Sequence, residues 1–116
     1  MDITIKDLQS YLTHHYGQCG TEQGMFMKLV EEMGEVAEIL NKRSGRKADD
    51  GADLQLELGR ELADVIHYAV AIAAINGLDL NAIMLEKDSQ ASVKYHHTIN
   101  LETFIQNREK ETTGNP

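Results

Sequence analysis

Residues 62–75 constrain the fold most, because this segment, LADVIHYAVAIAAI, is apolar on nearly every side of a helix. A helix that is hydrophobic all round must also be buried all round. The chain has 116 residues, which suits a single domain with one core. A lone four-helix bundle of this size buries each helix on one side only, so we expect a partner subunit to cover the remaining surface.

Helical spacing of apolar residues recurs along the chain and predicts five helices, over residues 3–17, 22–43, 54–75, 80–95 and 101–107. Thr21 and Asp79 suit the N-cap positions of the second and fourth helices, and Asn76–Gly77 ends the third. The polar segment 41–53 is expected to form a loop. No segment predicts a strand. The expected fold class is therefore all-α, of four-helix-bundle type with four to five helices, assembled with a partner subunit.

Charge and composition argue against several classes of function. The formal net charge is −8, and such a chain should not bind DNA or RNA, which requires a basic surface. Binding of a smaller polyanion would need a divalent cation between the two. Cys19 is the only cysteine, so the chain has no internal disulfide. Residues 1–18 lack the apolar core of a signal peptide, and the longest unbroken apolar run, residues 69–75, is too short to span a bilayer. We therefore expect a cytoplasmic protein with no membrane partner.

The second predicted helix has an acidic side opposite its apolar stripe. At about 100° per residue, Glu31, Glu35 and Glu38 share that side, and Glu32 lies at its edge. Two explanations remain open for this pattern. One is a solvated acidic face, on which Lys28 could pair with Glu32 four residues later. The other is a ligand set for a cation.

The third predicted helix favours the cation. Glu57, Glu61 and Asp64 form one stripe, and no lysine or arginine lies three or four residues after Glu61 or Asp64. Unpaired carboxylates in apolar surroundings are costly and normally either protonate or bind a cation. Exposure at the edge of the helix, with water as partner, is the alternative. Antiparallel packing of the two helices would bring four carboxylates together, from Glu32, Glu35, Glu61 and Asp64, and such hard oxygen ligands suit Mg²⁺ or Mn²⁺.

The two acidic motifs resemble a known family. "EEMGE", residues 31–35, followed by "ELAD", residues 61–64, is similar to the E-E-x-x-E and E-x-x-D signature of the MazG-like all-α nucleoside triphosphate pyrophosphatases. The similarity continues through the apolar helix and the Gly-x-Asp break that follows it, and it covers about residues 22–95. The resemblance implies a MazG-like domain over residues 1–97, with a short C-terminal helix and flexible tail over 98–116.

The resemblance also implies a function and residue roles. Family members cleave a (d)NTP between the α- and β-phosphates, giving (d)NMP and pyrophosphate, often to remove unwanted nucleotides from the pool. They act as dimers or as dimers of dimers, which implies a homodimer or homotetramer here. Carried over, the residues that bind Mg²⁺ are Glu32, Glu35, Glu61 and Asp64. Lys87 and Lys94 match the phosphate-binding lysines, whereas Ala91 stands where the family usually has asparagine.

The hydrolysis needs a water that attacks the α-phosphorus, and Glu31 or Glu35 is the candidate catalytic base. The basic residues Lys42, Arg43, Arg46 and Lys47 either close over the triphosphate or form a solvated loop. Three aromatic residues, with His14 or His15 beside them, are candidates for contact with the base: Tyr11, Tyr16 and Phe26.

Three alternatives stay open. The chain could be specific for dUTP or for phosphoribosyl-ATP, or it could be a non-enzymatic dimeric helical adaptor.

Overall fold

The computed structural model describes residues 1–17, 20–45 and 53–113. Five helices account for most of them: α1 (Ile5–Tyr16), α2 (Glu22–Arg43), α3 (Leu54–Ile75), α4 (Leu80–Lys94) and α5 (Leu101–Thr113). No strand occurs in these ranges. The all-α prediction is therefore confirmed for the part of the chain described. The helices belong to two compact units, residues 1–78 and 79–116.

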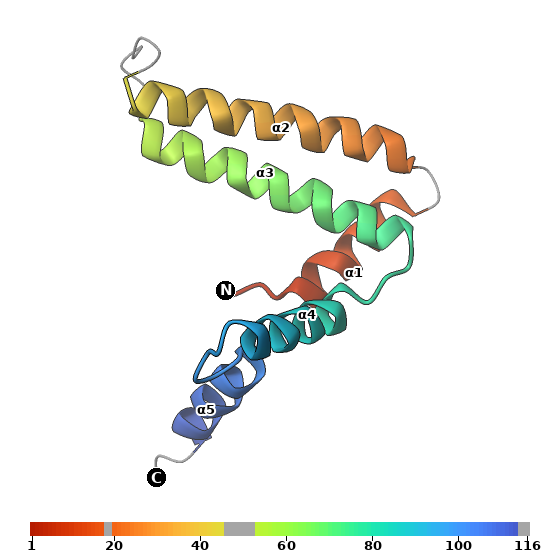
Figure 1. The fold of residues 1–116 in the computed structure, drawn as a ribbon. Coiled ribbons are helices and arrows are strands. Elements are labelled where there is room, and N and C mark those ends of the chain that lie inside the picture. Colours follow the sequence, from red (N-terminus) through yellow and green to blue (C-terminus); the bar gives the residue numbers. More distant parts are fainter. Residues whose placement is uncertain (18–19, 46–52, 114–116) are drawn as a thin grey trace. The chain divides into compact units, whose positions relative to one another are not determined.

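In the first unit, α3 packs against both α1 and α2 (Figure 1). Helices α2 and α3 have the same length, lie side by side and run in opposite directions, as the sequence predicted. The core of this unit consists of Leu12, Ile39 and the small or branched residues at the C-terminal half of α3: Val70, Ala71, Ala73 and Ala74. The small alanine side chains leave room for neighbouring helices to pack against this half of α3.

Side-chain caps fix where the helices begin. Thr21 accepts a hydrogen bond from the Gly24 amide at the start of α2, and Asp79 accepts one from Ala82 at the start of α4. Both predicted caps are thus confirmed. Asp53 caps α3 in the same way, and Thr4 forms a capping box with Asp7 on α1. Gly77 adopts a φ of 64° after α3, a left-handed conformation that glycine tolerates best.

The second unit is a pair of helices, α4 and α5, that pack against each other. The Leu101 amide donates a 2.6 Å hydrogen bond to Asp88 Oδ2, and Asn100 caps α5 by accepting from the Thr103 amide. Helix α5 continues to Thr113, six residues beyond the predicted end at residue 107. The flexible tail was expected from residue 108, and residues 108–113 are helical instead. Residues 114–116 lie outside the described residues, as do Cys19, Arg46 and Lys47.

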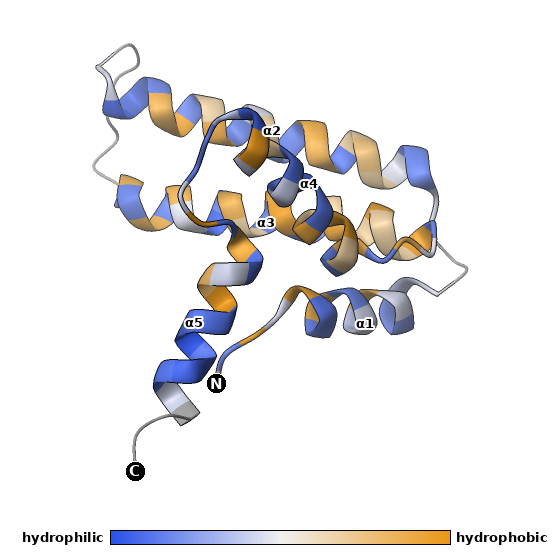
Figure 2. Cartoon of the chain, turned by 60° about the horizontal axis from the view of Figure 1, so that its bottom comes forward, coloured by the Kyte–Doolittle hydropathy of each residue, from blue (hydrophilic) through white to orange (hydrophobic). Residues whose placement is uncertain are grey.

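Burial of α3 differs from the sequence expectation within a single chain. Val70 and Ala71 are buried, but Leu62 and Ile66 remain about half exposed. Figure 2 shows that hydrophobic residues recur along α2 and α3. A bundle completed by a partner subunit stays a prediction, and so does the boundary of the predicted domain at residue 97.

No single helix in the described ranges is both long and apolar enough to cross a membrane, and α3 and α4 meet that requirement only when counted together across their break.

Candidate active site

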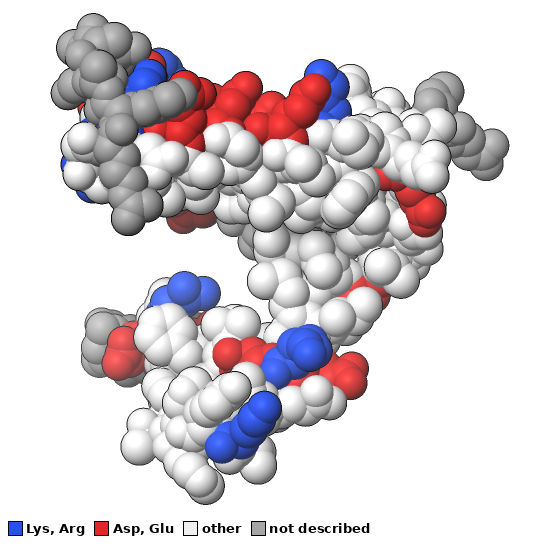
Figure 3. All heavy atoms as spheres, turned by 45° about the horizontal axis from the view of Figure 1, so that its top comes forward, with Lys and Arg blue, Asp and Glu red and all other residues white. Residues whose placement is uncertain are grey.

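The antiparallel packing of α2 and α3 places the EEMGE motif of α2 opposite the ELAD motif of α3 (Figure 1). One carboxylate oxygen from each of Glu32, Glu61 and Asp64 lies within 4.8 Å of the other two. Glu32 and Glu61 are half-buried, whereas Asp64 is exposed. We call these three residues the acidic cluster. Figure 3 shows acidic side chains gathered in a row along the α2 edge of this unit.

Glu35 approaches the acidic cluster from α2. The pKa of Glu61 is raised from 4.5 to about 8, because its carboxyl lies within hydrogen-bonding distance of the Glu32 and Glu35 carboxylates and is partly desolvated. Repulsion between like charges adds to the same effect. Without a cation, Glu61 therefore keeps its proton to a higher pH than an ordinary glutamate does. The structure brings together all four residues whose sequence pattern suggested a shared ligand set.

Two oxygens of the acidic cluster have no donor. Glu32 Oε2 and Glu61 Oε2 are buried, and no described residue donates a hydrogen bond to either. Buried carboxylate oxygens are normally paired with a donor or a cation. Several carboxylates with oxygens within reach of one another form the hard donor set that Mg²⁺ or Mn²⁺ prefers, so the residues present fit a divalent cation.

Glu31, the other candidate base, lies outside this cluster. It is exposed and its Oε2 is 3.3 Å from Lys28 Nζ, an ion pair that raises the pKa of Lys28. The prediction that Lys28 could pair with Glu32, four residues away, was wrong: it pairs with Glu31, three residues away, because Glu32 turns toward α3. Of the two candidate bases, only Glu35 lies beside the acidic cluster.

A groove of about 350 Å³ begins at the acidic cluster and is formed by both helices. We call it the charged groove; its lining residues are Glu35, Glu38, Ile39, Lys42, Glu57, Arg60 and Glu61. Arg60 was missed by the sequence analysis, which considered only positions after Glu61 and Asp64. Arg60 lies four residues before Asp64, so the two share one side of the helix. This spacing could have identified Arg60 as a neighbour of the acidic motif.

The two predicted phosphate-binding lysines belong to the second unit. Lys87 and Lys94 lie two turns apart on α4 and line one groove of about 310 Å³ with Gln90, Ala91 and Tyr95. Lys94 Nζ lies 5.3 Å from the centroid of the Tyr95 ring, within the range of a cation–π contact. Ala91, at the usual asparagine position, lies between the two lysines and offers no polar side chain.

Aromatic and histidine side chains join α1 to α3. The Tyr16 hydroxyl and His67 Nε2 are 2.7 Å apart, and burial, followed by the nearby Tyr68 and Tyr11, raises the pKa of Tyr16. Tyr11 stacks on His15, with 5.8 Å between ring centroids. Half-buried His67 thus contributes to packing, while His14 is exposed and takes no part in these ring contacts.

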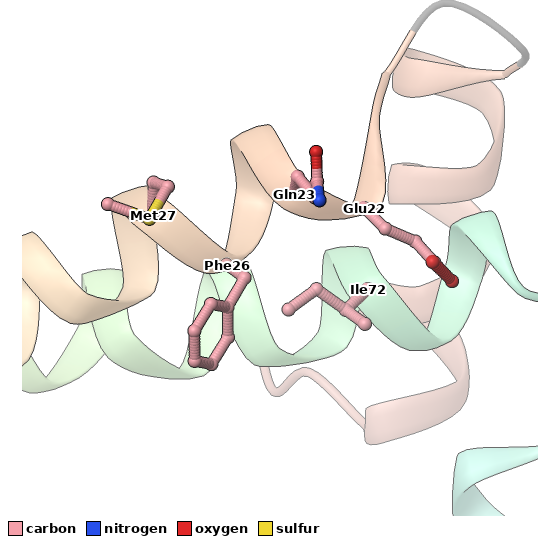
Figure 4. Close-up of a pocket in the computed structure, with 5 residues that line it drawn as sticks. All are labelled: Glu22, Gln23, Phe26, Met27 and Ile72. Atoms are coloured by element: carbon pink, nitrogen blue, oxygen red, sulfur yellow. The ribbon is translucent and has the colours of Figure 1, made fainter.

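Phe26 lies in a different environment from Tyr11 and Tyr16. It is 54% exposed and lines a groove of about 580 Å³ with Glu22, Gln23, Met27 and Ile72, shown in Figure 4. We call this the apolar groove. The structure therefore separates the three aromatic residues that the sequence grouped as candidates for contact with a base.

A family model describes the region that contains both acidic motifs. The model of the MazG nucleotide pyrophosphohydrolase domain matches residues 20–93, more than half of the chain. The chain belongs to the MazG family. This finding confirms the resemblance that the motifs indicated, and it agrees with the all-helical fold and with the convergence of the two motifs.

Individual relatives are consistent with this membership. The uncharacterized protein YpjD of Bacillus subtilis is 31% identical to this MazG-family chain over 84 residues, which are 69% of this chain and 74% of YpjD. The uncharacterized protein YvdC of the same organism is 28% identical over 105 residues, which cover 82% of this chain and 99% of YvdC. The crystal structure of iMazG from Vibrio DAT 722 is similar with a TM-score of 0.58 and 28% identity, over 80% of this chain and 98% of that one.

Proposed function

We propose that this MazG-family chain hydrolyses nucleoside triphosphates between the α- and β-phosphates, releasing a nucleoside monophosphate and pyrophosphate, and thereby removes unwanted nucleotides. The observation that supports the proposal most directly is the acidic cluster with Glu35 beside it. Its buried oxygens lack donors, and a divalent cation would complete them. Family membership supplies the reaction class of nucleotide pyrophosphohydrolysis.

Glu32, Glu35, Glu61 and Asp64 are the residues that would hold Mg²⁺, with Mn²⁺ as the alternative ion. When bound, the ion polarises phosphoryl oxygens and offsets the repulsion between a triphosphate and a chain of net charge −8. Phosphoryl transfer depends mainly on positioning and on electrostatic stabilisation. The rigid, antiparallel α2–α3 pair supplies the positioning.

Glu35 is the proposed base. Its carboxylate is exposed, lies close enough to Glu61 to raise the pKa of that residue, and lines the charged groove. It can therefore accept a proton from the water that attacks the α-phosphorus. Lys87 and Lys94, which share one groove, bind phosphate oxygens as point charges.

The exposed apolar residues of α2 and α3 support a homodimer or a homotetramer. Besides Phe26, they include Met33 and Leu40 on α2, and Leu62 and Ile66 on α3, each between 44% and 55% exposed. Large contiguous apolar patches on monomers are uncommon and mark interaction sites. A second copy of the chain would cover these residues and so bury α3 on the sides that one chain leaves exposed.

The test follows pyrophosphate from each of the four dNTPs and four NTPs, with and without Mg²⁺. We expect pyrophosphate as the first product, only with a divalent ion. Orthophosphate as the first product, or no reaction with any nucleotide, would contradict the proposal. Activity limited to dUTP, or to phosphoribosyl-ATP if that compound is added to the panel, would narrow the substrate without changing the chemistry.

A further inference from the structure

Arg60 contributes a cation to the charged groove. It is exposed, and it forms no ion pair with any carboxylate in the described ranges, although Glu57 and Glu61 line the same groove. A guanidinium beside carboxylates normally pairs with one of them, often through two hydrogen bonds. Its donors are therefore available to an anionic ligand.

The charged groove is continuous with the acidic cluster. Glu35 and Glu61 border the groove, and Glu61 also belongs to the cluster, so an anion bound beside the cluster extends directly into the groove. Arg60 precedes Glu61 in α3 and is therefore about 100° around the helix from it. Lys42 enters the groove from α2, seven residues and two turns beyond Glu35. The two cations thus come from opposite helices.

The charge balance of the groove depends on the cluster. Four carboxylates and two cationic side chains line the groove, so without a metal ion it is acidic overall. A divalent cation held by Glu32, Glu35, Glu61 and Asp64 would offset two of their four negative charges. Among the other charged residues that line the groove, Glu38 and Glu57 are matched in number by Lys42 and Arg60. Metal binding would therefore reduce the repulsion between the groove and a phosphate.

We propose that the charged groove binds the β- and γ-phosphates, the part of the nucleotide that leaves as pyrophosphate, and that Arg60 is the residue that binds them. This inference rests on the proposed function, because it places the leaving group relative to the cleaved bond. The planar guanidinium fits the paired oxygens of a phosphate, which an ammonium group does not. Arg60 then favours triphosphates over monophosphates, independently of the base.

The test compares Arg60→Ala and Arg60→Lys with Arg108→Ala, which removes the same charge from exposed α5. With Mg²⁺ present, we expect Arg60→Ala to raise KM for a triphosphate and the inhibition constant of inorganic pyrophosphate about tenfold, with kcat nearly unchanged. Arg60→Lys should recover only part of the affinity. Inhibition by a nucleoside monophosphate should not change, and Arg108→Ala should behave as the parent protein.

Calorimetry with inorganic pyrophosphate and Mg²⁺ separates this proposal from the proposed function. If the parent protein binds pyrophosphate and Arg60→Ala loses that binding, the groove assignment holds even where no nucleotide is cleaved. If nucleotides are cleaved but Arg60→Ala binds pyrophosphate as tightly as the parent, the assignment is overturned. An equal loss of affinity for monophosphate and pyrophosphate would also overturn it, because Arg60 would then not distinguish the leaving group.

Discussion

Helices α2 and α3 form two grooves with opposite chemistry. The charged groove is lined mainly by carboxylates and by cations such as Arg60, whereas the apolar groove is centred on Phe26, Met27 and Ile72. The backbone geometry is the same helix pair in both cases. The residues that each turn presents therefore determine the chemical character of each groove. The comparison teaches that one helix pair can form a charged groove and an apolar groove at different turns.

The largest expected effect comes from removing one carboxylate of the acidic cluster. Glu61→Gln should lower the rate of pyrophosphate release about 100-fold or more, since even the outer partners of metal ligands contribute about 10- to 100-fold. The matched control is Glu22→Gln, the same change in the apolar groove, which should leave the rate within about twofold of the parent. If both variants lowered the rate equally, the proposed functional difference between the two grooves would be wrong.

The second prediction concerns pH and metal removal. In the folded, metal-free protein the pKa of Glu61 is about 8, against 4.5 for the ordinary group, so folding strengthens proton binding at this site. The stabilisation is complete below about pH 4.5 and is lost as the pH rises through about 8. In EDTA, the melting temperature should therefore fall across this window for the parent protein, and less so for Glu61→Gln.

Added Mg²⁺ should counteract this dependence of the melting temperature on pH. The ion needs deprotonated ligands, so the increase in melting temperature on adding Mg²⁺ should be larger near pH 8.5 than near pH 6. Thermal melts at both pH values measure it. An equal increase at both would show that Glu61 does not bind the ion.

The third prediction tests the apolar groove as part of a contact between subunits. Phe26→Glu should raise the dissociation constant of the oligomer about tenfold or more, because a buried charge would replace an aromatic contact. Sedimentation over a concentration series measures this. Ile3→Glu, at an exposed position before α1, should leave association unchanged. A parent protein that remains monomeric at all concentrations would contradict the proposed assembly.

The smallest expected effect comes from two glycines of α2. A Cβ at Gly34, beside the acidic cluster, would meet no atom within 4 Å, whereas one at Gly24 would lie 2.7 Å from Thr21 Oγ1, the cap of the helix. Gly34→Ala should therefore raise the free energy of unfolding by about 1 kcal/mol, and Gly24→Ala should lower it. Denaturation in urea measures both. The reverse order would show that the cap contributes little.

Local sequence signals were sufficient for the helices and their caps. Thr21 and Asp79 were identifiable because an N-cap needs only a short polar side chain before an apolar repeat. The end of α5 could not be identified from the sequence, because residues 108–113 are polar and show no apolar repeat. The burial of α3 was overestimated for one chain, since the sequence pattern does not state which neighbour covers each side of a helix.

The acidic motifs indicated which helices meet, but not the contacts around them. The convergence of Glu32, Glu61 and Asp64 followed from helical spacing and antiparallel packing. The Lys28–Glu31 pair did not follow from spacing, and neither did the lack of an ion pair at Arg60 among the described residues. Spacing allows several partners, and side-chain rotamers select among them. The contact between Tyr16 and His67 joins residues 51 positions apart, which no local pattern specifies.

The two buried oxygens without donors, Glu32 Oε2 and Glu61 Oε2, have a consequence for the life of the protein in a cell. A ligand that binds only the native state increases its population. If magnesium is the ligand, as proposed, its supply would govern how long each molecule survives proteolysis as well as how fast it turns over. A cell that runs short of the ion would lose the protein itself, and restoring activity would require new synthesis.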